Sequence, residues 1–372
     1  MEHVTARFVD TDTHLWEEYA DWTKYVDDPR HLAFVPRYVD GVGGRKRILV
    51  EGTVFPANTA HPGVTPRGPD HPDYAIVQDP VRRLEYMDSL ATDVSVIFPS
   101  TAHIGTTTSM RDAEVAAGLC RAYNRYATEF ASIDPVRLRP TMIVPANHPY
   151  AAAEEIRVAK QLGLSAIVLH PTPPDDVPWS DPRHDAIWHT AEELDIPVIF
   201  HETSAGCPDY AVGMSRYRSF AMFWFCSHVV EALLALTEMI FGGVLERFPR
   251  LRIALAEAHV SWIPGWLAML DQNKDLEAHR HGDQAAAPAL TMLPSEYFRR
   301  QCWVMAFPDD SMVDDVLAIA PDNLLVSSDF PHNSGKLHGQ GGLLAFSRRP
   351  GLTEAAAEHV LVDNPKKFLG LI

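Results

Sequence analysis

The sequence is poor in cysteine. Four cysteines occur among 372 residues, and no two of them form a Cys-x-x-Cys pair. A thiolate zinc site and a disulfide framework both need grouped or paired cysteines, so we expect neither. The simplest compartment for such a chain is a reducing cytoplasm.

Positive charge is also scarce. The chain has 32 Lys and Arg residues against 49 Asp and Glu residues, which gives a formal net charge of −17. Because a phosphate backbone and an anionic lipid surface both attract clusters of Lys and Arg, we expect neither nucleic acid nor a membrane as a partner. The first residues, MEHVTARF, lack the apolar core of a signal peptide.

Long apolar runs are missing as well. No uninterrupted run reaches the roughly 18 apolar residues of a membrane-spanning helix. The longest apolar segment, 229–245, contains Glu231 and Glu238, so we expect a packed core helix there. No internal repeat or low-complexity linker divides the chain, which favours a single domain over residues 1–372.

What the sequence does contain is an alternation of short β-branched runs with longer helical patterns. Such βα units predict an α/β fold, specifically a (β/α)₈ TIM barrel, with a doubly wound open sheet as the alternative. The last helical pattern, 362–371, predicts a closing helix with Asn364 as its cap. The expected strands are 7–14, 93–100, 138–145, 164–171, 196–203, 251–258, 300–307 and 323–330. The expected helices between them include 80–91, 111–131, 152–163, 184–195 and 308–320.

Three connections are longer than a minimal barrel needs. Residues 15–79 are rich in Pro, Gly, His and Trp and predict a long insertion or lid segment after strand 1. Residues 204–222 and 272–298 are shorter excursions after the fifth and sixth strands. Connections that follow the strands of a barrel lie at its C-terminal face, so we expect these segments to form the walls of a substrate pocket.

Ionisable side chains close five of the predicted strands. Each follows an apolar run that is buried on both faces, at the end where a barrel strand delivers its last side chain to the active site. Such groups are costly to bury unless they are paired or bind a metal ion. The residues are Asp12, His14, His170, His201, Glu202, Glu257 and Asp329.

Within this set, Asp12 and His14 have the spacing of two that puts both side chains on one face of a strand. Histidine nitrogen and carboxylate oxygen are the usual ligands of Zn²⁺, Fe²⁺ and Mn²⁺. We therefore predict a site for one or two divalent metal ions. The expected ligands are Asp12, His14, His201, Glu257 and Asp329. Asp10, Glu17, His170, Glu202 and His332 are expected either to support these ligands or to bind a second ion, Asp10 by holding a ligand histidine in its tautomer.

Ordinary structural roles stay open for several of these residues. His170 can bond a backbone group at the turn before Pro171, Glu257 can cap the following helix, and Asp329 can be a turn residue. For two further histidines, His103 in a loop and His228 in an apolar helix, loop and core roles are favoured over a role in the site.

Four motifs resemble the amidohydrolase-related family that includes aminocarboxymuconate semialdehyde decarboxylase and the resorcylate-type decarboxylases. They are VDTDTHLWE (9–17), IPVIFHE (196–202), the long motif 242–271 and VSSDFPHNSG (326–335). The resemblance implies a (β/α)₈ barrel with a divalent metal at the strand ends. Carried over position by position, it assigns metal binding to Asp12, His14, His201 and Asp329.

The sequence also departs from that family. Asp12 stands where many members have a histidine, and Glu257 stands where the decarboxylases carry another. The family's glycine-rich turn is replaced by Ala258, His259 and Val260. A site richer in carboxylate oxygen shifts the expected preference from Zn²⁺ towards Fe²⁺ or Mn²⁺ and weakens direct transfer of the decarboxylase mechanism.

Two enzyme classes follow from these residues. The first is a metal-dependent hydrolase or non-oxidative decarboxylase of a small carboxylate-bearing molecule, with Asp329 as proton shuttle and His170, Glu257 or His259 orienting the substrate or donating a proton. The second is a dinuclear non-haem Fe or Mn/Fe oxygenase that hydroxylates a small amino or carboxylic acid. The reason for this second class is that the sequence offers more candidate ligand residues than one metal ion can bind.

Association with another chain is also expected. Residues 219–236 are unusually apolar and aromatic for the outer helix of a barrel. They predict either a homo-oligomer or a complex with a paralogous subunit, in which the chain itself could be catalytically idle. Burial against the insertion explains the same composition.

Overall fold

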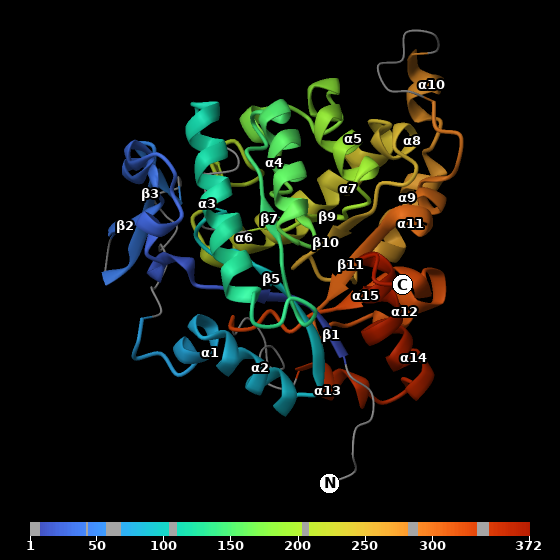
Figure 1. The fold of residues 1–372 in the computed structure, drawn as a ribbon. Coiled ribbons are helices and arrows are strands. Elements are labelled where there is room, and N and C mark those ends of the chain that lie inside the picture. Colours follow the sequence, from blue (N-terminus) through green and yellow to red (C-terminus); the bar gives the residue numbers. More distant parts are fainter. Residues whose placement is uncertain are drawn as a thin grey trace.

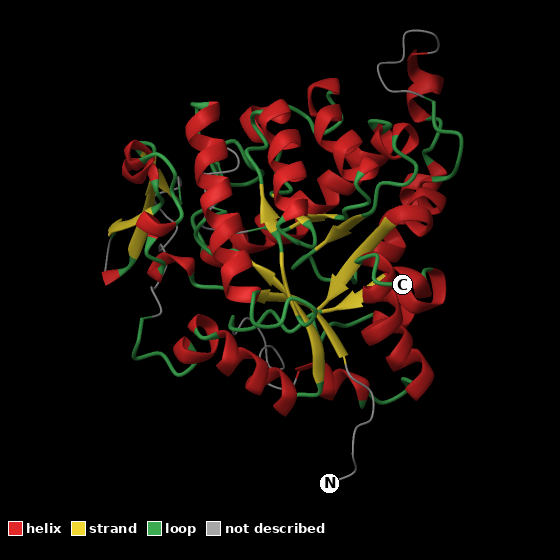
Figure 2. Cartoon of the chain, in the orientation of Figure 1, coloured by secondary structure: helices red, strands yellow, loops and turns green. Residues whose placement is uncertain are grey.

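The computed structural model describes residues 8–41, 44–56, 68–103, 110–202, 208–281, 289–332 and 342–372. Its central strands are surrounded by helices, which confirms the predicted α/β class (Figures 1 and 2). Helices α3, α4 and α5 lie along one side of the strands, and α11, α12 and α14 lie along the other (Figure 1).

The central strands are all parallel and follow one another in chain order. They form two hydrogen-bonded sheets, of order β1-β5-β6 and β7-β8-β9-β10-β11-β12, and only Thr141 separates β6 from β7. Their bounds are β1 Phe8–His14, β5 Thr92–Phe98, β6 Leu138–Pro140, β7 Met142–Ile143, β8 Ile167–Leu169, β9 Val198–Phe200, β10 Ile253–Leu255, β11 Cys302–Ala306 and β12 Leu324–Val326. Every run expected to be a strand overlaps one or two of these strands, and β5 begins one residue before the expected run.

Contacts also join the last strand to the first. The Thr11 hydroxyl donates to the Val326 carbonyl at 3.0 Å, and the Asp329 amide donates to the Asp12 carbonyl at 3.0 Å. Just beyond, Thr13 and Phe330 form a parallel bridge. These bonds bring the residues that follow β12 beside the end of β1, although more than three hundred positions separate them in the chain.

The two faces of the strands pack against different partners. Val94, Val96 and Phe98 of β5 belong to a cluster formed by strand side chains, whereas Ile97 packs in the larger cluster under the helices. This alternation follows the strand period of two, and it leaves both faces apolar because helices cover the outer one. The buried ionisable groups that form the candidate site lie towards the ends of the strands.

Side-chain caps mark the start of two of the longer helices. Asp79 accepts from the Val81 amide before α2, and Asp112 accepts from the Glu114 amide before α3. The principal helices are α2 Pro80–Ser89, α3 Ala113–Ala131, α4 Pro149–Gln161, α5 Asp185–Glu193, α7 Glu231–Phe241, α9 Ile263–Gln272, α11 Pro294–Gln301 and α12 Val313–Ile319. The shorter ones are α1 Tyr74–Gln78, α6 Phe220–Trp224, α8 Val244–Arg247, α10 Leu276–His281, α13 Gly342–Ser347, α14 Glu354–Glu358 and α15 Asn364–Phe368.

Residues 15–79 lie between β1 and β5 and contain more regular structure than their sequence indicates. An antiparallel sheet of β2 (Arg37–Asp40), β3 (Lys46–Val50) and β4 (Thr53–Phe55) lies to the side of the central strands (Figure 1). Its apolar side chains pack against α3. Residues 42–43 and 57–67 of the segment lie outside the described residues.

One long helix is interrupted by a wider turn. A π-helical turn, Phe225–Val230, joins α6 to α7. By length and apolar composition the whole stretch Phe220–Phe241 could cross a membrane, but 44% of its most apolar window is buried inside the protein. Leu236, Met239 and Ile240 lie in the main core cluster, as a core helix requires.

The C-terminal helix corrects one prediction. Asn364 does not cap it, because the helical path already begins at Glu354, where Thr353 accepts from the Ala356 amide at 3.2 Å. The Asn364 amide instead donates to the carbonyls of Pro321 at 2.8 Å and Leu324 at 2.9 Å. It thereby attaches this helix to the start of β12.

Candidate metal centre

The donor residues project from the same end of neighbouring parallel strands. Asp12 and His14 lie among the last three residues of β1. His201 directly follows β9, and Glu257 lies two residues beyond β10. Asp329 lies three residues beyond β12. All five are buried. The structure therefore places all five residues that were expected to bind metal at the same end of the strands.

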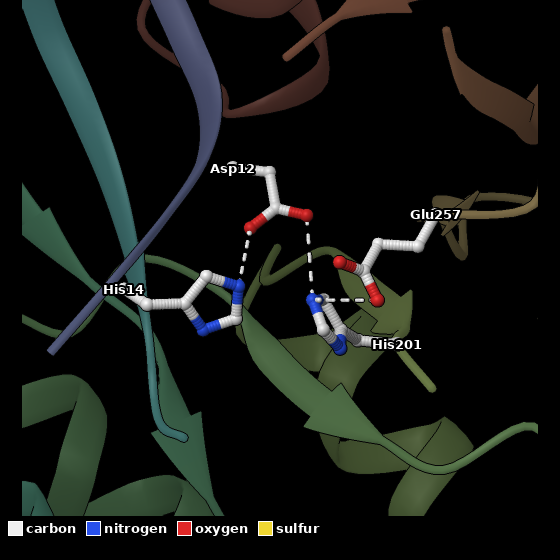
Figure 3. A group of neighbouring side chains, drawn as sticks. All are labelled: Asp12, His14, His201 and Glu257. Atoms are coloured by element: carbon white, nitrogen blue, oxygen red, sulfur yellow. Dashed lines mark ion pairs between the residues drawn. The ribbon is translucent and has the colours of Figure 1, made fainter. Parts of the chain in front are cut away.

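The centre of the group is the Asp12 carboxylate. Its Oδ1 lies 3.3 Å from His14 Nε2, and its Oδ2 lies 3.3 Å from His201 Nε2. Glu257 approaches from the side, with Oε2 at 4.0 Å from His201 Nε2 (Figure 3). One ligand atom from each of these four residues lies within 4.8 Å of the others, a spacing that one cation can span.

The chemistry of these atoms fits a divalent cation. Both carboxylate oxygens of Asp12, together with Nε2 of His14 and of His201, are buried and have no hydrogen-bond partner within the described ranges. His14 Nδ1 faces the Pro99 carbonyl at 2.9 Å, so Nδ1 carries a proton, and in the neutral ring Nε2 would present its lone pair to the group. Buried polar atoms left without partners are rare, and a bound cation would satisfy these.

A second set of donors overlaps the first. His14, Glu257, Asp329 and His332 also bring ligand atoms within 4.8 Å of one another. Asp329 Oδ1 lies 3.4 Å from His14 Nε2 and 2.7 Å from His332 Nδ1. The part of the fourth motif beyond His332 lies outside the described residues.

Two of the donor residues have unusual backbone conformations. Glu257 has φ 55° and Asp329 has φ 56°, both in the left-handed region that residues with a Cβ rarely adopt. His259, two residues after Glu257, has φ 52°. Strain of this kind persists only where the surroundings hold it, and it concentrates at functional sites.

The buried carboxylates and imidazoles of this group shift one another's pKa values. Burial raises the pKa of Asp329, but His332 and His14 outweigh it and hold the pKa well below its usual range. Burial lowers the pKa of His14, but Asp12 and Asp329 reverse this and raise it well above its usual range. Because a histidine binds a metal through a neutral imidazole, we expect metal binding to displace a proton from His14.

Asp10 and Glu17 bond backbone groups next to the donor residues and belong to neither donor set found among the described residues. Asp10 accepts from the Ser328 amide at 2.9 Å and the Ser328 hydroxyl at 2.6 Å, and burial raises its pKa to about 7. Asp10 thus fixes the chain just before Asp329. It does not hold the tautomer of His14, since the Pro99 carbonyl occupies His14 Nδ1.

Glu17 serves the loop that follows β5. Its carboxylate accepts from the amides of Ser100 at 2.9 Å and Ala102 at 2.5 Å. It belongs to neither donor set found among the described residues. Glu17 therefore shapes the wall of the site, next to His103, whose ring stacks against His170 at 6.1 Å.

A chain of alternating imidazoles and carboxylates leads away from Glu257. His170 Nε2 lies 3.5 Å from Glu202 Oε1, and Glu202 Oε2 lies 3.0 Å from His228 Nδ1. His228 Nε2 then lies 3.4 Å from Glu257 Oε2. Burial lowers the pKa of His228, but Glu202 and Glu257 outweigh it and raise it to about 9.

The sequence favoured a core role for His228, and the structure places it buried and in contact with Glu202 and Glu257. The signal available was an imidazole inside an otherwise apolar helix, but nothing in the sequence shows that the helix faces Glu257. A second partner was also missed. Asp310 contacts His259 Nδ1 and accepts from the Phe307 amide at 3.2 Å. The expected helix 308–320 consequently begins only at Val313, after this turn.

Comparisons with known proteins agree with this architecture. The sequence model of a family described as Amidohydrolase matches residues 9–371. A 2-amino-3-carboxymuconate-6-semialdehyde decarboxylase from Dictyostelium discoideum is 24% identical over 305 residues, which cover 79% of this chain and 77% of that protein. Among solved structures, amidohydrolase map2389c from Mycobacterium avium subsp. paratuberculosis superposes with a TM-score of 0.76 at 20% identity, covering 99% of this chain and 100% of that one. The 5-carboxyvanillate decarboxylase from Novosphingobium aromaticivorans, complexed with manganese and 4-hydroxy-3-methoxy-5-nitrobenzoic acid, has a TM-score of 0.65 at 18% identity and covers 80% of this chain and 82% of that one.

Proposed function

The chain belongs to the amidohydrolase family, and on that premise we propose that it is a metal-dependent enzyme that removes a carboxyl group from, or hydrolyses, a small carboxylated aromatic molecule. The observation that carries the proposal is the convergence of buried, unpartnered donor atoms of Asp12, His14 and His201 beside Glu257. The substrate class follows from relatives whose names specify carboxylated aromatic or muconate substrates.

The fold in this proposal is a (β/α)₈ barrel. The parallel strand order and the bonds between β1 and the residues after β12 support a closed ring of strands. Residues 15–79 would then be an insertion after strand 1 that covers one side of the pocket. The domain would extend over residues 1–372, without a second folding unit.

A divalent cation held by Asp12, His14, His201 and Glu257 would supply a Lewis acid for a substrate carboxylate or for water. Asp329 would move the proton, because its carboxylate lies beside both the donor group and His332. In hydrolysis it would accept a proton from water, and in decarboxylation it would first take up a proton from water and then deliver it to the carbon that loses the carboxyl group. His259, oriented by Asp310, and His170 would orient the substrate or donate a second proton.

The donor atoms support a preference among divalent metals. Asp12 and Glu257 contribute carboxylate oxygen where decarboxylases of this family carry histidine. Harder oxygen donors favour Mn²⁺ or Fe²⁺ over Zn²⁺. The manganese in the carboxyvanillate decarboxylase structure supports this order of preference.

A second candidate function rests on the overlapping donor sets. Both contain His14 and Glu257, and a carboxylate can bridge two cations whereas an imidazole nitrogen binds one. Asp12 and His201 with one ion, and Asp329 and His332 with another, would make a dinuclear centre bridged by Glu257. A dinuclear Fe or Mn/Fe centre would suit an oxygenase that hydroxylates a small amino or carboxylic acid.

Elemental analysis of protein purified without added metal separates the two functions. One Mn²⁺, Fe²⁺ or Zn²⁺ per chain, with CO₂ or hydrolysis product released from carboxylated phenols and no O₂ consumed, supports the first. Two irons, or one iron and one manganese, with O₂ consumption, support the second. No bound transition metal after incubation with each of these ions contradicts both.

The proposal places the enzyme in the cytoplasm as a homo-oligomer or as a complex with a paralogous subunit. Phe220 and Met222 on α6, and Phe225 at the start of the π-helical turn, are about half exposed, which supports burial against another chain. Light scattering coupled to size exclusion tests this, since a monomer at micromolar concentration contradicts the homo-oligomer.

A further inference from the structure

His228 lies in an irregular part of its helix, beside the candidate metal centre. The π-helical turn Phe225–Val230 contains it, and across this turn Phe225 faces outward, 58% exposed, while His228 is 6% exposed. π-helical turns are rare and are frequently found at functional sites. In this turn the imidazole lies against two buried carboxylates, those of Glu202 and Glu257.

The two ring nitrogens of His228 have different partners. Nδ1 lies 3.0 Å from the Trp224 carbonyl oxygen, and because a carbonyl only accepts, Nδ1 donates to it. The Ser227 hydroxyl and Glu202 Oε2 also lie 3.0 Å from Nδ1, the latter at ion-pair distance. Nε2 faces Glu257 Oε2 at 3.4 Å. The Trp224 ring stacks on the imidazole at 4.6 Å with an angle of 22° between the planes. The ring is thus fixed in both its plane and its rotation.

The same oxygen of Glu257 meets the metal-binding group. Oε2 lies 3.4 Å from His228 Nε2 and 4.0 Å from His201 Nε2. Glu257 stands in the left-handed backbone region, and its side chain is the least buried of the four donors in the first set. A flexible carboxylate on a strained backbone needs an external contact to keep one oxygen directed at the centre.

We propose that His228 is a positioning residue that holds Glu257 directed at the group formed by Asp12, His14 and His201. Glu202 anchors the ring in this arrangement, and His170, whose Nδ1 accepts from the Thr172 amide at 3.1 Å, anchors Glu202 in turn. This inference rests on the proposed function only in requiring a metal centre. It adds a residue outside the ligand set that controls how tightly the cation is held.

The test measures Mn²⁺ affinity and the electron paramagnetic resonance spectrum of the bound ion, in the full chain. His228→Ala should weaken Mn²⁺ binding by about 10- to 100-fold and alter the spectrum, as losses of contacts that orient metal ligands do. His184→Gln is the matched control, because His184 is buried and bonded to the Pro178 carbonyl but contacts none of the donors. It should bind Mn²⁺ as the wild type does.

Two conservative variants separate positioning from a merely structural role. Gln places an amide nitrogen near the position of Nε2, and Asn places one near the position of Nδ1. If the contact with Glu257 is what matters, His228→Gln recovers most of the Mn²⁺ affinity and His228→Asn does not. Recovery by Asn alone, at equal thermal stability, assigns His228 to holding the helix and overturns the proposal.

The remaining outcomes distinguish this inference from the proposed function. His228→Ala that is folded by circular dichroism and binds Mn²⁺ with wild-type affinity and spectrum overturns the inference alone. Absence of Mn²⁺, Fe²⁺ and Zn²⁺ binding by the wild type itself overturns the proposed function and removes the inference with it.

Discussion

Asp12 Oδ2 lies 3.3 Å from His201 Nε2, so a carboxylate on β1 faces an imidazole that follows β9 across the centre of the strand ends. Neither atom has a hydrogen-bond partner within the described part of the chain. The pair joins the ends of the first and fifth predicted strands, and a cation bound there would contact both residues.

Removal of the His201 imidazole should empty the site. We expect His201→Ala to lower bound metal to a small fraction of the wild-type content, because the first donor set then keeps a single nitrogen donor, Nε2 of His14. Elemental analysis after desalting measures the change. Added Mn²⁺ should raise the melting temperature of the wild type but not of this variant, since a ligand stabilises only the state that binds it. Unchanged metal content would remove His201 from the site.

The carboxylate of Asp12 should set metal preference. Asp12→His recreates the His-x-His pair that many members of the family carry, and imidazole favours Zn²⁺ more than carboxylate does. We expect the ratio of Zn²⁺ to Mn²⁺ affinity to rise by about tenfold or more. Competition between the two ions in one titration measures this ratio. An unchanged ratio would show that position 12 does not touch the ion.

Asp329 should matter for the proton more than for the ion. Asp329→Asn keeps the shape of the side chain but cannot exchange a proton, so we expect kcat on a carboxylated phenol to fall by about 10²- to 10⁴-fold. The four donors of the first set should still retain the metal. Asp322→Asn, which changes an exposed carboxylate paired with His359, should leave kcat unchanged. Wild-type kcat in Asp329→Asn would exclude it as proton shuttle.

Stability should depend on pH through Glu18. Burial, together with the neighbouring Glu17 carboxylate, raises the pKa of Glu18 from 4.5 to about 7. The folded protein therefore keeps a proton that the unfolded chain releases, and stability falls as pH rises from 4.5 to about 7. Glu18→Gln should remove this loss and gain about 1–2 kcal/mol over the wild type at the upper end of the window.

Urea denaturation at intervals of pH measures that difference. Glu85→Gln, at an exposed helix position beside Arg82, is the control and should follow the wild type at each pH. A constant difference between Glu18→Gln and the wild type across the window would contradict the raised pKa.

Much of the site could be predicted from local sequence. Apolar β-branched runs ended by ionisable residues mark both the strand and the end at which its last side chains meet, so Asp12, His14, His201, Glu257 and Asp329 were identified together. The period of two placed Asp12 and His14 on one face. These features depend on residues within a few positions of one another, which is why a single sequence reveals them.

The helices were less fully determined. Their apolar periodicity located α2, α3, α4 and α5 within a few residues, but α12 began late because the Asp310 side chain bonds the Phe307 amide and forms a turn. The cap expected at Asn364 failed for a similar reason, since its amide satisfies two carbonyls near β12. In both cases a polar side chain served a distant contact that its neighbours in sequence do not reveal.

The sequence by itself determined that the chain is an α/β protein with a set of carboxylates and imidazoles at its strand ends. Only the tertiary structure decided which of them share one centre and which support it. The contact of His228 with Glu257, the bonds of Glu17 to the loop after β5 and the bond of Asp10 to Ser328 each join residues that are far apart along the chain. Such contacts arise from the packing of whole strands and helices, and from a helical turn and left-handed residues that local propensity disfavours.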